Sequence, residues 1–133
     1  MKILIVDDNF VNRTVLQEIL KHYGSVHVAV NGHEAIEAVE QALSMGEPYK
    51  FACLDIMMPQ MDGQAALKKI RKIEEKAGYS FESRMKIIMT TALDDSANVM
   101  EAFREQCDGY LVKPVDKAKL LKLLEEAGIL SRE

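Results

Sequence analysis

Apolar residues along this chain form short continuous runs, separated by longer segments in which apolar residues recur every three or four positions. The continuous runs are rich in β-branched side chains, as expected for strands buried on both faces, and they are 3–6, 26–30, 51–54, 87–89 and 109–112. The helical spacing follows each run and predicts five helices: from Asn9 to Gly24, Ala35 to Leu43 with a break at Gly46, Asp62 to Gly78, around 99–103, and Asp116 to Gly128.

This alternation predicts an α/β fold, because strands that alternate with helices form a parallel sheet with helices on both faces and right-handed crossovers. The usual arrangement of five such strands is the flavodoxin-like, doubly wound sheet of order 2-1-3-4-5. Its ligands bind at the carboxyl ends of strands 1 and 3, where the strand order reverses.

Composition adds limits to this prediction. The chain has 133 residues, 48% hydrophobic and 29% charged, and we expect one globular domain over residues 1–128 with a short C-terminal tail, 129–133. The net charge of −4 leaves no basic excess, so we expect no nucleic-acid binding. No apolar run is long enough for a secretory signal or a membrane span, which suggests a cytoplasmic protein with reduced cysteines.

Polar residues with related chemistry follow four of the predicted strands. Strand 1 ends in Asp7 and Asp8, strand 3 in Asp55, strand 4 in Thr91, and strand 5 in Lys113. Each of these residues alone is most simply a cap or a turn residue. In the order 2-1-3-4-5, however, the four strands are adjacent, so three carboxylates, a hydroxyl and an ammonium converge on one edge.

Three carboxylates that lie close together repel one another unless a cation is present. Oxygen ligands without Cys or His suit Mg²⁺, which takes one or two protein carboxylates and keeps several waters. A magnesium site beside a free carboxylate, with Lys113 and Thr91 opposite, suits phosphoryl transfer to Asp55, which would give an acyl phosphate.

These positions resemble a known family, the receiver domain of bacterial two-component response regulators. The resemblance covers residues 2 to about 127 and rests on Asp7 and Asp8, Asp55 followed by Met58, Pro59, Asp62 and Gly63, Thr91 with Ala92, and Lys113 with Pro114. We interpret Asp62 and Gly63 as a turn and helix start only.

The resemblance implies roles for the residues around the acidic site. Asp55 is the phospho-accepting nucleophile, Asp8 binds Mg²⁺ directly and Asp7 binds it largely through water, while the backbone carbonyl of Met57 completes the metal ligands. Lys113 pairs with the phosphoryl oxygens and forms a cis peptide bond with Pro114.

A switch is also implied. The Thr91 hydroxyl moves onto the phosphoryl group, and Tyr110 then rotates inward, which alters the face built by helix 4, strand 5 and helix 5. The alternative is that Tyr110 is an edge-strand residue with no switching role.

As a family member, the protein would be a switch rather than an enzyme. It would receive its phosphoryl group from a histidine kinase or a phosphotransfer protein, and act on a downstream protein that the sequence does not identify. Met1 and the helix end at Gly128 favour a complete, stand-alone regulator of the chemotaxis type, monomeric or dimerising on phosphorylation. An intermediate phosphoryl carrier in a phosphorelay is the alternative.

Two further readings share features with this one. A flavodoxin-like cofactor-binding module needs a Ser-, Thr- and Gly-rich loop after strand 1, whereas this loop starts with Asp7 and Asp8 and would repel a phosphate. A haloacid-dehalogenase-type phosphatase needs two aspartates two residues apart, and Met57 stands where the second would follow Asp55.

Two apolar residues near the site predict a long phosphoryl lifetime. Met57 and Leu93 are the second residues after Asp55 and Thr91, and neither has a strong hydrogen-bonding group to orient an attacking water. The alternative is that both merely line the rim while loop geometry sets the rate.

Overall fold

The centre of the molecule is a parallel sheet of five strands. The computed structural model describes residues 1–58, 61–92 and 107–130. The strands are β1 (Lys2–Val6), β2 (Ser25–Ala29), β3 (Phe51–Asp55), β4 (Lys86–Thr91) and β5 (Gly109–Val112). Their order is β2-β1-β3-β4-β5 and every neighbouring pair is parallel, which confirms the predicted topology.

Four helices lie within the described ranges: α1 (Phe10–Leu20), α2 (Gly32–Ser44), α3 (Gly63–Lys76) and α5 (Lys117–Glu126). Each begins after an Asn or Asp whose side chain accepts a hydrogen bond from the N–H three residues later, and these caps are Asn9, Asn31, Asp62 and Asp116. The helix expected around 99–103 lies outside the described residues. No described helix has the length and apolar character needed to span a membrane.

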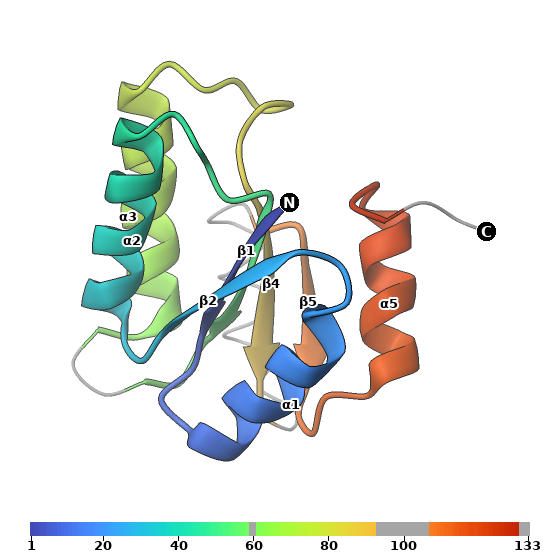
Figure 1. Cartoon of the computed structure of the whole chain (residues 1–133). Helices are drawn as coiled ribbons and strands as arrows, with labels where there is room; N and C mark the ends of the chain where they lie inside the picture. The colour runs from blue at the N-terminus through green and yellow to red at the C-terminus, as the bar shows by residue number, and fades with distance from the viewer. Residues whose placement is uncertain (59–60, 93–106, 131–133) are drawn as a thin grey trace.

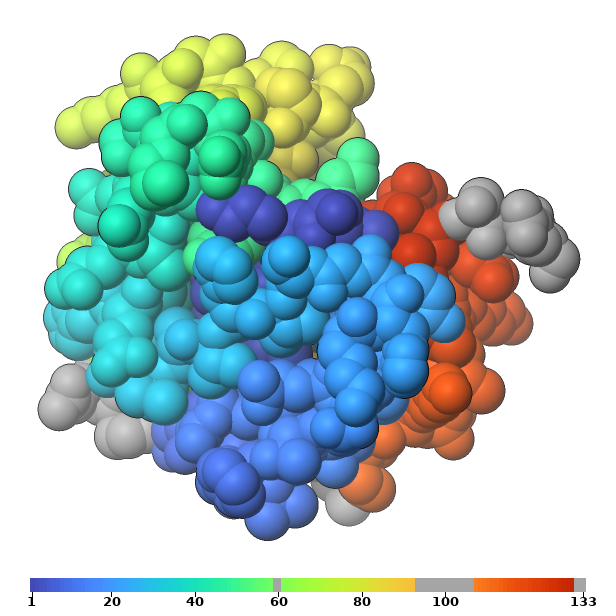
Figure 2. Space-filling view, viewed as in Figure 1, coloured from blue at the N-terminus to red at the C-terminus, as the bar shows by residue number. Residues whose placement is uncertain are grey.

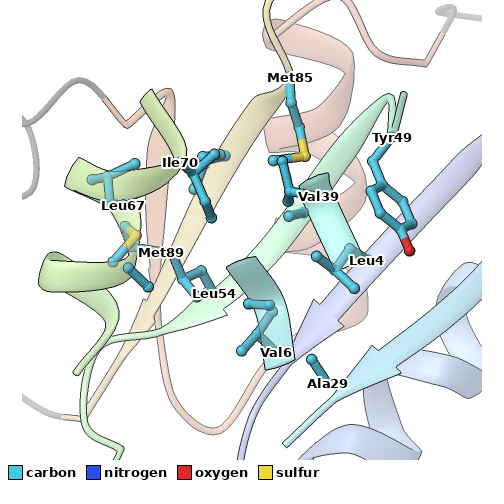
Figure 3. Close-up of a cluster of buried hydrophobic side chains, with 14 of the residues drawn as sticks. Leu4, Val6, Ala29, Val39, Tyr49, Leu54, Leu67, Ile70, Met85 and Met89 are labelled. Carbon is cyan, nitrogen blue, oxygen red and sulfur yellow. The ribbon is translucent and has the colours of Figure 1, made fainter. Parts of the chain in front are cut away.

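The helices cover both faces of the sheet (Figure 1), with α2 and α3 on one face and α1 and α5 on the other. The face under α2 and α3 holds the larger apolar core, in which side chains of β1, β3 and β4 interdigitate with the helices (Figure 3). Alternate residues of the same strands point to the other face, so the central strands are buried on both sides, as their continuous apolar runs predict.

The second core lies under α1 and α5. Leu16 and Leu20 of α1 and Leu120 and Leu124 of α5 are buried there against the sheet. Ile129, which we assigned to the C-terminal tail, is 8% exposed and belongs to this core. The packed part of the chain therefore extends past the end of α5.

A buried charge network ties α3 to the amino ends of β4 and β5. Arg71 donates hydrogen bonds to Glu74 at 2.7 Å, to the Met85 carbonyl at 2.7 Å and to Asp108 at 3.0 Å. Asp108 also accepts from the Ile87 N–H at 2.8 Å. These bonds fix Asp108, the residue before β5, at the amino end of the strands.

Candidate functional site

The site residues gather at the carboxyl end of the sheet, toward which the arrowheads of β4 and β5 point at the bottom of Figure 1. Asp7 directly follows β1, Asp55 ends β3, Thr91 ends β4 and Lys113 follows β5. The register pairs Asp55 with Thr90 across the β3–β4 ladder, and Thr91 with Val112 across the β4–β5 ladder. The strand order therefore brings these polar side chains to one edge, as predicted.

Three carboxylates form the acidic part of the site. One oxygen from each of Asp7, Asp8 and Asp55 lies within 4.8 Å of the other two. Asp7 and Asp55 are buried, at 0% and 2% exposure, whereas Asp8 is exposed. The cluster is thus open to solvent on the side of Asp8 and closed on the side of the sheet.

Lys113 supplies the countercharge. Its Nζ lies 3.1 Å from Oδ2 of Asp7 and 3.1 Å from Oδ2 of Asp55. The backbone of this residue is held in place, because Lys113 N donates to the Thr91 carbonyl at 2.7 Å. The Lys113-Pro114 peptide bond is cis, as the resemblance implies.

The electrostatics of this group affect Asp55 most. Burial and, next, repulsion from Asp7 raise the pKa of Asp55 to about 6, although Lys113 opposes the increase. Burial alone would lower the pKa of Lys113, but the carboxylates of Asp55 and Asp7 outweigh it and leave that pKa raised. Lys113 is therefore a permanent cation, whereas the Asp55 carboxylate is held under electrostatic strain.

The loop after β1 is fixed by its own residues. Asn9 N donates to Oδ1 of Asp7 at 2.8 Å, and Arg13 donates through Nη1 to the Asp7 carbonyl at 2.9 Å. The Asp7 side chain is therefore oriented before any ligand arrives. Sequence reasoning missed Arg13. The available signal was its position one helical turn after Asn9, because helical side chains point back toward the amino terminus.

The loop after β3 depends on a glycine. Met57 N donates to Oδ1 of Asp55 at 3.2 Å, and Gly63 N donates to the Ile56 carbonyl at 2.8 Å. A Cβ at Gly63 would collide with the backbone carbonyl of Asp55. Gly63 is therefore more than the turn and helix start that we predicted, because it lets α3 begin directly against the acceptor residue.

The remaining predicted residues lie near this edge or outside the described ranges. Thr91 is buried and donates its hydroxyl to the Ala92 carbonyl at 3.1 Å. Tyr110 is 42% exposed on β5, opposite Met89. The Met57 side chain is 61% exposed. Leu93 lies outside the described residues.

The acidic cluster fits a hard divalent cation. All three side chains offer carboxylate oxygens, which Mg²⁺ prefers over nitrogen and sulfur. Although the Lys113 ammonium is close, Oδ2 of Asp7 is buried without a hydrogen bond of good geometry from any described residue. An acceptor left in this state is expected where a further cation or its water completes the site.

Comparison with protein families decides the identity of this arrangement. The model of the response regulator receiver domain matches residues 3–125, which is nearly the whole chain. The chain belongs to this family. It is thus a receiver domain of two-component signalling, a family of phospho-accepting switches.

Relatives of this receiver domain include parts of much longer proteins. The osmosensing histidine protein kinase SLN1 of Saccharomyces cerevisiae is 34% identical over 128 residues, which cover 95% of this chain and 10% of that protein. The next two relatives are also histidine kinases, and the chain spans 14% and 7% of their length.

Solved structures show the same fold. The receiver domain of the histidine kinase CKI1 from Arabidopsis thaliana, complexed with Mg²⁺ and BeF₃⁻, has a TM-score of 0.80 and 31% identity, covering 96% of this chain and 89% of that one. A chain from the co-crystal structure of the phosphotransfer protein Ypd1 and the Ssk1 receiver domain of Saccharomyces cerevisiae has a TM-score of 0.81 and 29% identity, covering 96% and 88%.

Proposed function

We propose that this receiver domain is a phosphorylation-activated switch that accepts a phosphoryl group on Asp55 from a histidine kinase or a phosphotransfer protein. The observation that carries the proposal is the placement of Asp55. It is a buried carboxylate with a raised pKa, 3.1 Å from a fixed ammonium, within a cluster of carboxylates that suits Mg²⁺. The first three relatives are histidine kinases, and the Ssk1 receiver was crystallised with a phosphotransfer protein, which supports this class of donor.

In the proposed reaction, one carboxylate oxygen of Asp55 attacks the phosphorus of a phosphohistidine in line with the bond that breaks. The new bond is an acyl phosphate, and the imidazole of the donor leaves with the bonding electrons and takes up a proton from solvent. The Met57 N–H holds the other oxygen of Asp55 during this step, and Lys113 stands where it neutralises charge on the phosphoryl oxygens.

A magnesium ion would be held by Asp8 and Asp55, by Asp7 largely through water, and by the backbone carbonyl of Met57. When bound, it supplies positive charge that offsets the phosphoryl oxygens and the repulsion within the acidic cluster.

The output of the switch would run through Thr91 and Tyr110. The Thr91 hydroxyl, which donates only to the neighbouring Ala92 carbonyl among the described residues, is free to turn toward a phosphoryl group on the adjacent strand end. Tyr110 would then rotate inward and change the surface formed by β5, α5 and the helix expected around 99–103.

The phosphorylation is tested by incubating the protein with Mg²⁺ and a small acyl-phosphate donor and measuring its intact mass. We expect the mass of one phosphoryl group to be added, and Asp55→Asn to prevent the addition, because an amide is not a nucleophile. Asp62→Asn is the matched control, since Asp62 is an exposed helix cap outside the cluster and Asn preserves the cap. Unchanged labelling of Asp55→Asn would place the acceptor elsewhere.

The metal site is tested with Asp8→Ala in a titration with Mg²⁺ followed by tyrosine fluorescence or NMR. We expect much weaker Mg²⁺ binding together with a metal-free stability that rises by about 1 kcal/mol, because one of three mutually repelling charges is removed. An unfolded Asp8→Ala protein would show that the acid pair is structural instead.

A phosphorelay carrier is the second candidate, and the similarity to short parts of histidine kinases favours it. Rapid return of the phosphoryl group from Asp55 to a phosphotransfer protein would identify a carrier, whereas a stable acyl phosphate in its presence would identify a terminal switch.

A further inference from the structure

Strand β2 is an edge of the sheet, with β1 on one side only. Ser25 N donates to the Met1 carbonyl at 2.9 Å and Asp7 N donates to the Ala29 carbonyl at 3.2 Å, so the backbones of Ser25 and Ala29 face β1. Successive residues of a strand direct these groups alternately to one side and the other. The N–H and C=O groups of Val26 and Val28 therefore point away from the sheet.

These outward groups have no hydrogen-bond partner within the described part of the chain. The Val30 N–H, next in the series, is different, because it donates to the Glu34 side chain at 3.1 Å and closes that end of the edge. Figure 2 shows the molecule from the side of β2, where the light-blue strand is uncovered at the front.

Exposed edges usually carry a charge, a proline or a bulge that prevents pairing with another strand. The edge formed by β2 has none of these, since its sequence is Ser-Val-His-Val-Ala and its pairing with β1 is regular. Val28 is 38% exposed, so an apolar β-branched side chain is held open at the edge.

The sequence of β2 is nearly symmetric about its central histidine. If two copies of the strand run antiparallel about a two-fold axis through His27, Val26 of each copy lies opposite Val28 of the other, and Ser25 lies opposite Ala29. The outward groups of the valines then form the hydrogen-bonded pairs, and the two His27 residues form the pair without hydrogen bonds between them. Every position thus meets a residue of matching size, which is what a closed two-fold interface requires.

We propose that two copies of this chain associate through β2. The two β2 strands pair antiparallel and join the two sheets into one continuous sheet. The matched pairs across the axis favour a second copy over a strand of a different protein. The interface lies at the opposite edge of the sheet from β5, so it leaves the surface proposed for output uncovered.

The face of the sheet beside β2 is hollowed on the side of α2. A cavity of about 400 Å³ opens between this strand and α2, with Ser25 and His27 on its floor and the small side chains Ala38 and Ala42 on its helical wall. Tyr49 OH lies 2.9 Å from Nδ1 of His27 and holds the ring over this side of the sheet. The imidazole therefore does not cover the free edge.

Such an interface is small, because it consists of a short strand pair with few neighbouring contacts. Interfaces below about 1,200 Å² generally form weak, transient complexes. We therefore expect a reversible dimer that is populated only at high protein concentration, with or without a phosphoryl group on Asp55.

The first test is sedimentation of the unmodified protein over a range from micromolar to millimolar concentration. We expect a shift to twice the mass of the chain, and the same shift for Asp55→Asn, which separates this inference from the proposed phosphorylation. Val28→Lys should raise the dissociation constant by about tenfold or more, since an edge lysine resists strand pairing. Val28→Thr, the control, should leave the dimer intact.

The second test fixes the register by cross-linking. Residues opposite each other in a pair without hydrogen bonds have Cα atoms about 4.5 Å apart, within the range of a disulfide. His27→Cys should therefore give a covalent dimer under mild oxidation, while Val28→Cys should not, because its copies are offset along the strands. The native Cys53 and Cys107 are buried.

A protein that stays monomeric at every concentration, or a His27→Cys variant that cross-links no faster than Val28→Cys, would overturn the proposal. A dimer that Val28→Lys leaves unchanged would place the interface elsewhere and would overturn it as well.

Discussion

Among single residues, Asp55 combines two properties that oppose each other in the free protein. It must be ionised to act as the proposed nucleophile, yet burial and the Asp7 carboxylate raise its pKa to about 6. Lys113, 3.1 Å away, offsets part of this effect. The electrostatic free energy needed to place this carboxylate beside Asp7 is therefore spent when the protein folds and not when Asp55 reacts.

This shift predicts how stability depends on pH in metal-free buffer. Because the pKa of Asp55 is higher in the folded state than in the unfolded chain, the folded protein binds this proton more tightly, and the contribution of Asp55 to stability is lost as pH rises through about 6. Urea unfolding with a chelator at about pH 5 and about pH 7 measures the effect. Asp55→Asn should be more stable than the wild type at the higher pH, with a smaller difference at the lower pH.

The opposite result would be a wild type whose stability increases relative to that of Asp55→Asn as the pH rises. It would mean that Lys113 lowers the pKa of Asp55 by more than burial and repulsion raise it. Asp62→Asn is again the control, because its carboxylate is exposed and lies outside the cluster.

The lifetime of the phosphoryl group is a second prediction at this scale. Replacing Met57 with Asn and Leu93 with Glu should speed dephosphorylation by about tenfold or more, because polar groups at these positions can orient the attacking water. The decay of phosphorylated protein, followed by intact mass after removal of the donor, measures the rate. A double variant that decays as slowly as the wild type would leave loop geometry as the determinant.

Site residues could be predicted from the sequence where they directly follow a predicted strand. Asp7, Asp8 and Asp55 were found because each follows an apolar run, and strand order alone brings them together. Arg13 and Gly63 were not found, because their roles depend on backbone positions. Arg13 donates to the backbone carbonyl of Asp7. Gly63 occupies a position where a Cβ would collide with the backbone carbonyl of Asp55. A sequence does not show such contacts until the loops are placed.

At the scale of elements, the start of a helix could be predicted where an Asn or Asp precedes the helical spacing. Asn9 and Asp116 stand at the start of predicted helices, and the side chain of each accepts a hydrogen bond from the N–H three residues later. The network of Arg71, Glu74 and Asp108 was not predicted, because its members are far apart in sequence and read as ordinary surface charges.

This network yields a prediction for the stability of the junction between α3, β4 and β5. Asp108→Ala removes an acceptor from Arg71 and from the Ile87 N–H, and should destabilise the protein by about 3 kcal/mol, the scale for one lost partner of a buried pair. Chemical denaturation measures it.

The control is Glu18→Ala, which breaks the solvent-exposed ion pair of Glu18 with Lys21 and should leave stability nearly unchanged. Equal effects of the two substitutions would show that the buried network contributes no more than a surface pair.

At the scale of the whole molecule, the sheet order links the two sides of the proposed switch. β4 stands between β3, which ends in Asp55, and β5, which carries Tyr110. A change at the end of β4 therefore reaches both neighbours through shared ladders. The order was predictable because alternating strands and helices allow few topologies, whereas the rotation of Tyr110 depends on side-chain contacts that no periodicity encodes.

Phosphorylation should therefore change the β5 and α5 surface and leave the β2 edge unchanged. NMR spectra recorded with and without the acyl-phosphate donor should show shifts at Tyr110 and along α5. The amides of 25–29, at the far edge of the sheet, serve as the internal control. Shifts restricted to the loops after β1 and β3 would reject the switch.

The bridge from Lys113 to two buried carboxylates also bears on how the domain behaves when its surroundings change. An internal ammonium already balances charge that would otherwise oppose folding, so we expect the polypeptide to reach its native structure without an added ion. Small zinc domains unfold when a chelator removes their metal. Here, removal of Mg²⁺ should stop phosphorylation of Asp55 while the fold stays intact, and adding Mg²⁺ again should restore phosphorylation without a refolding delay.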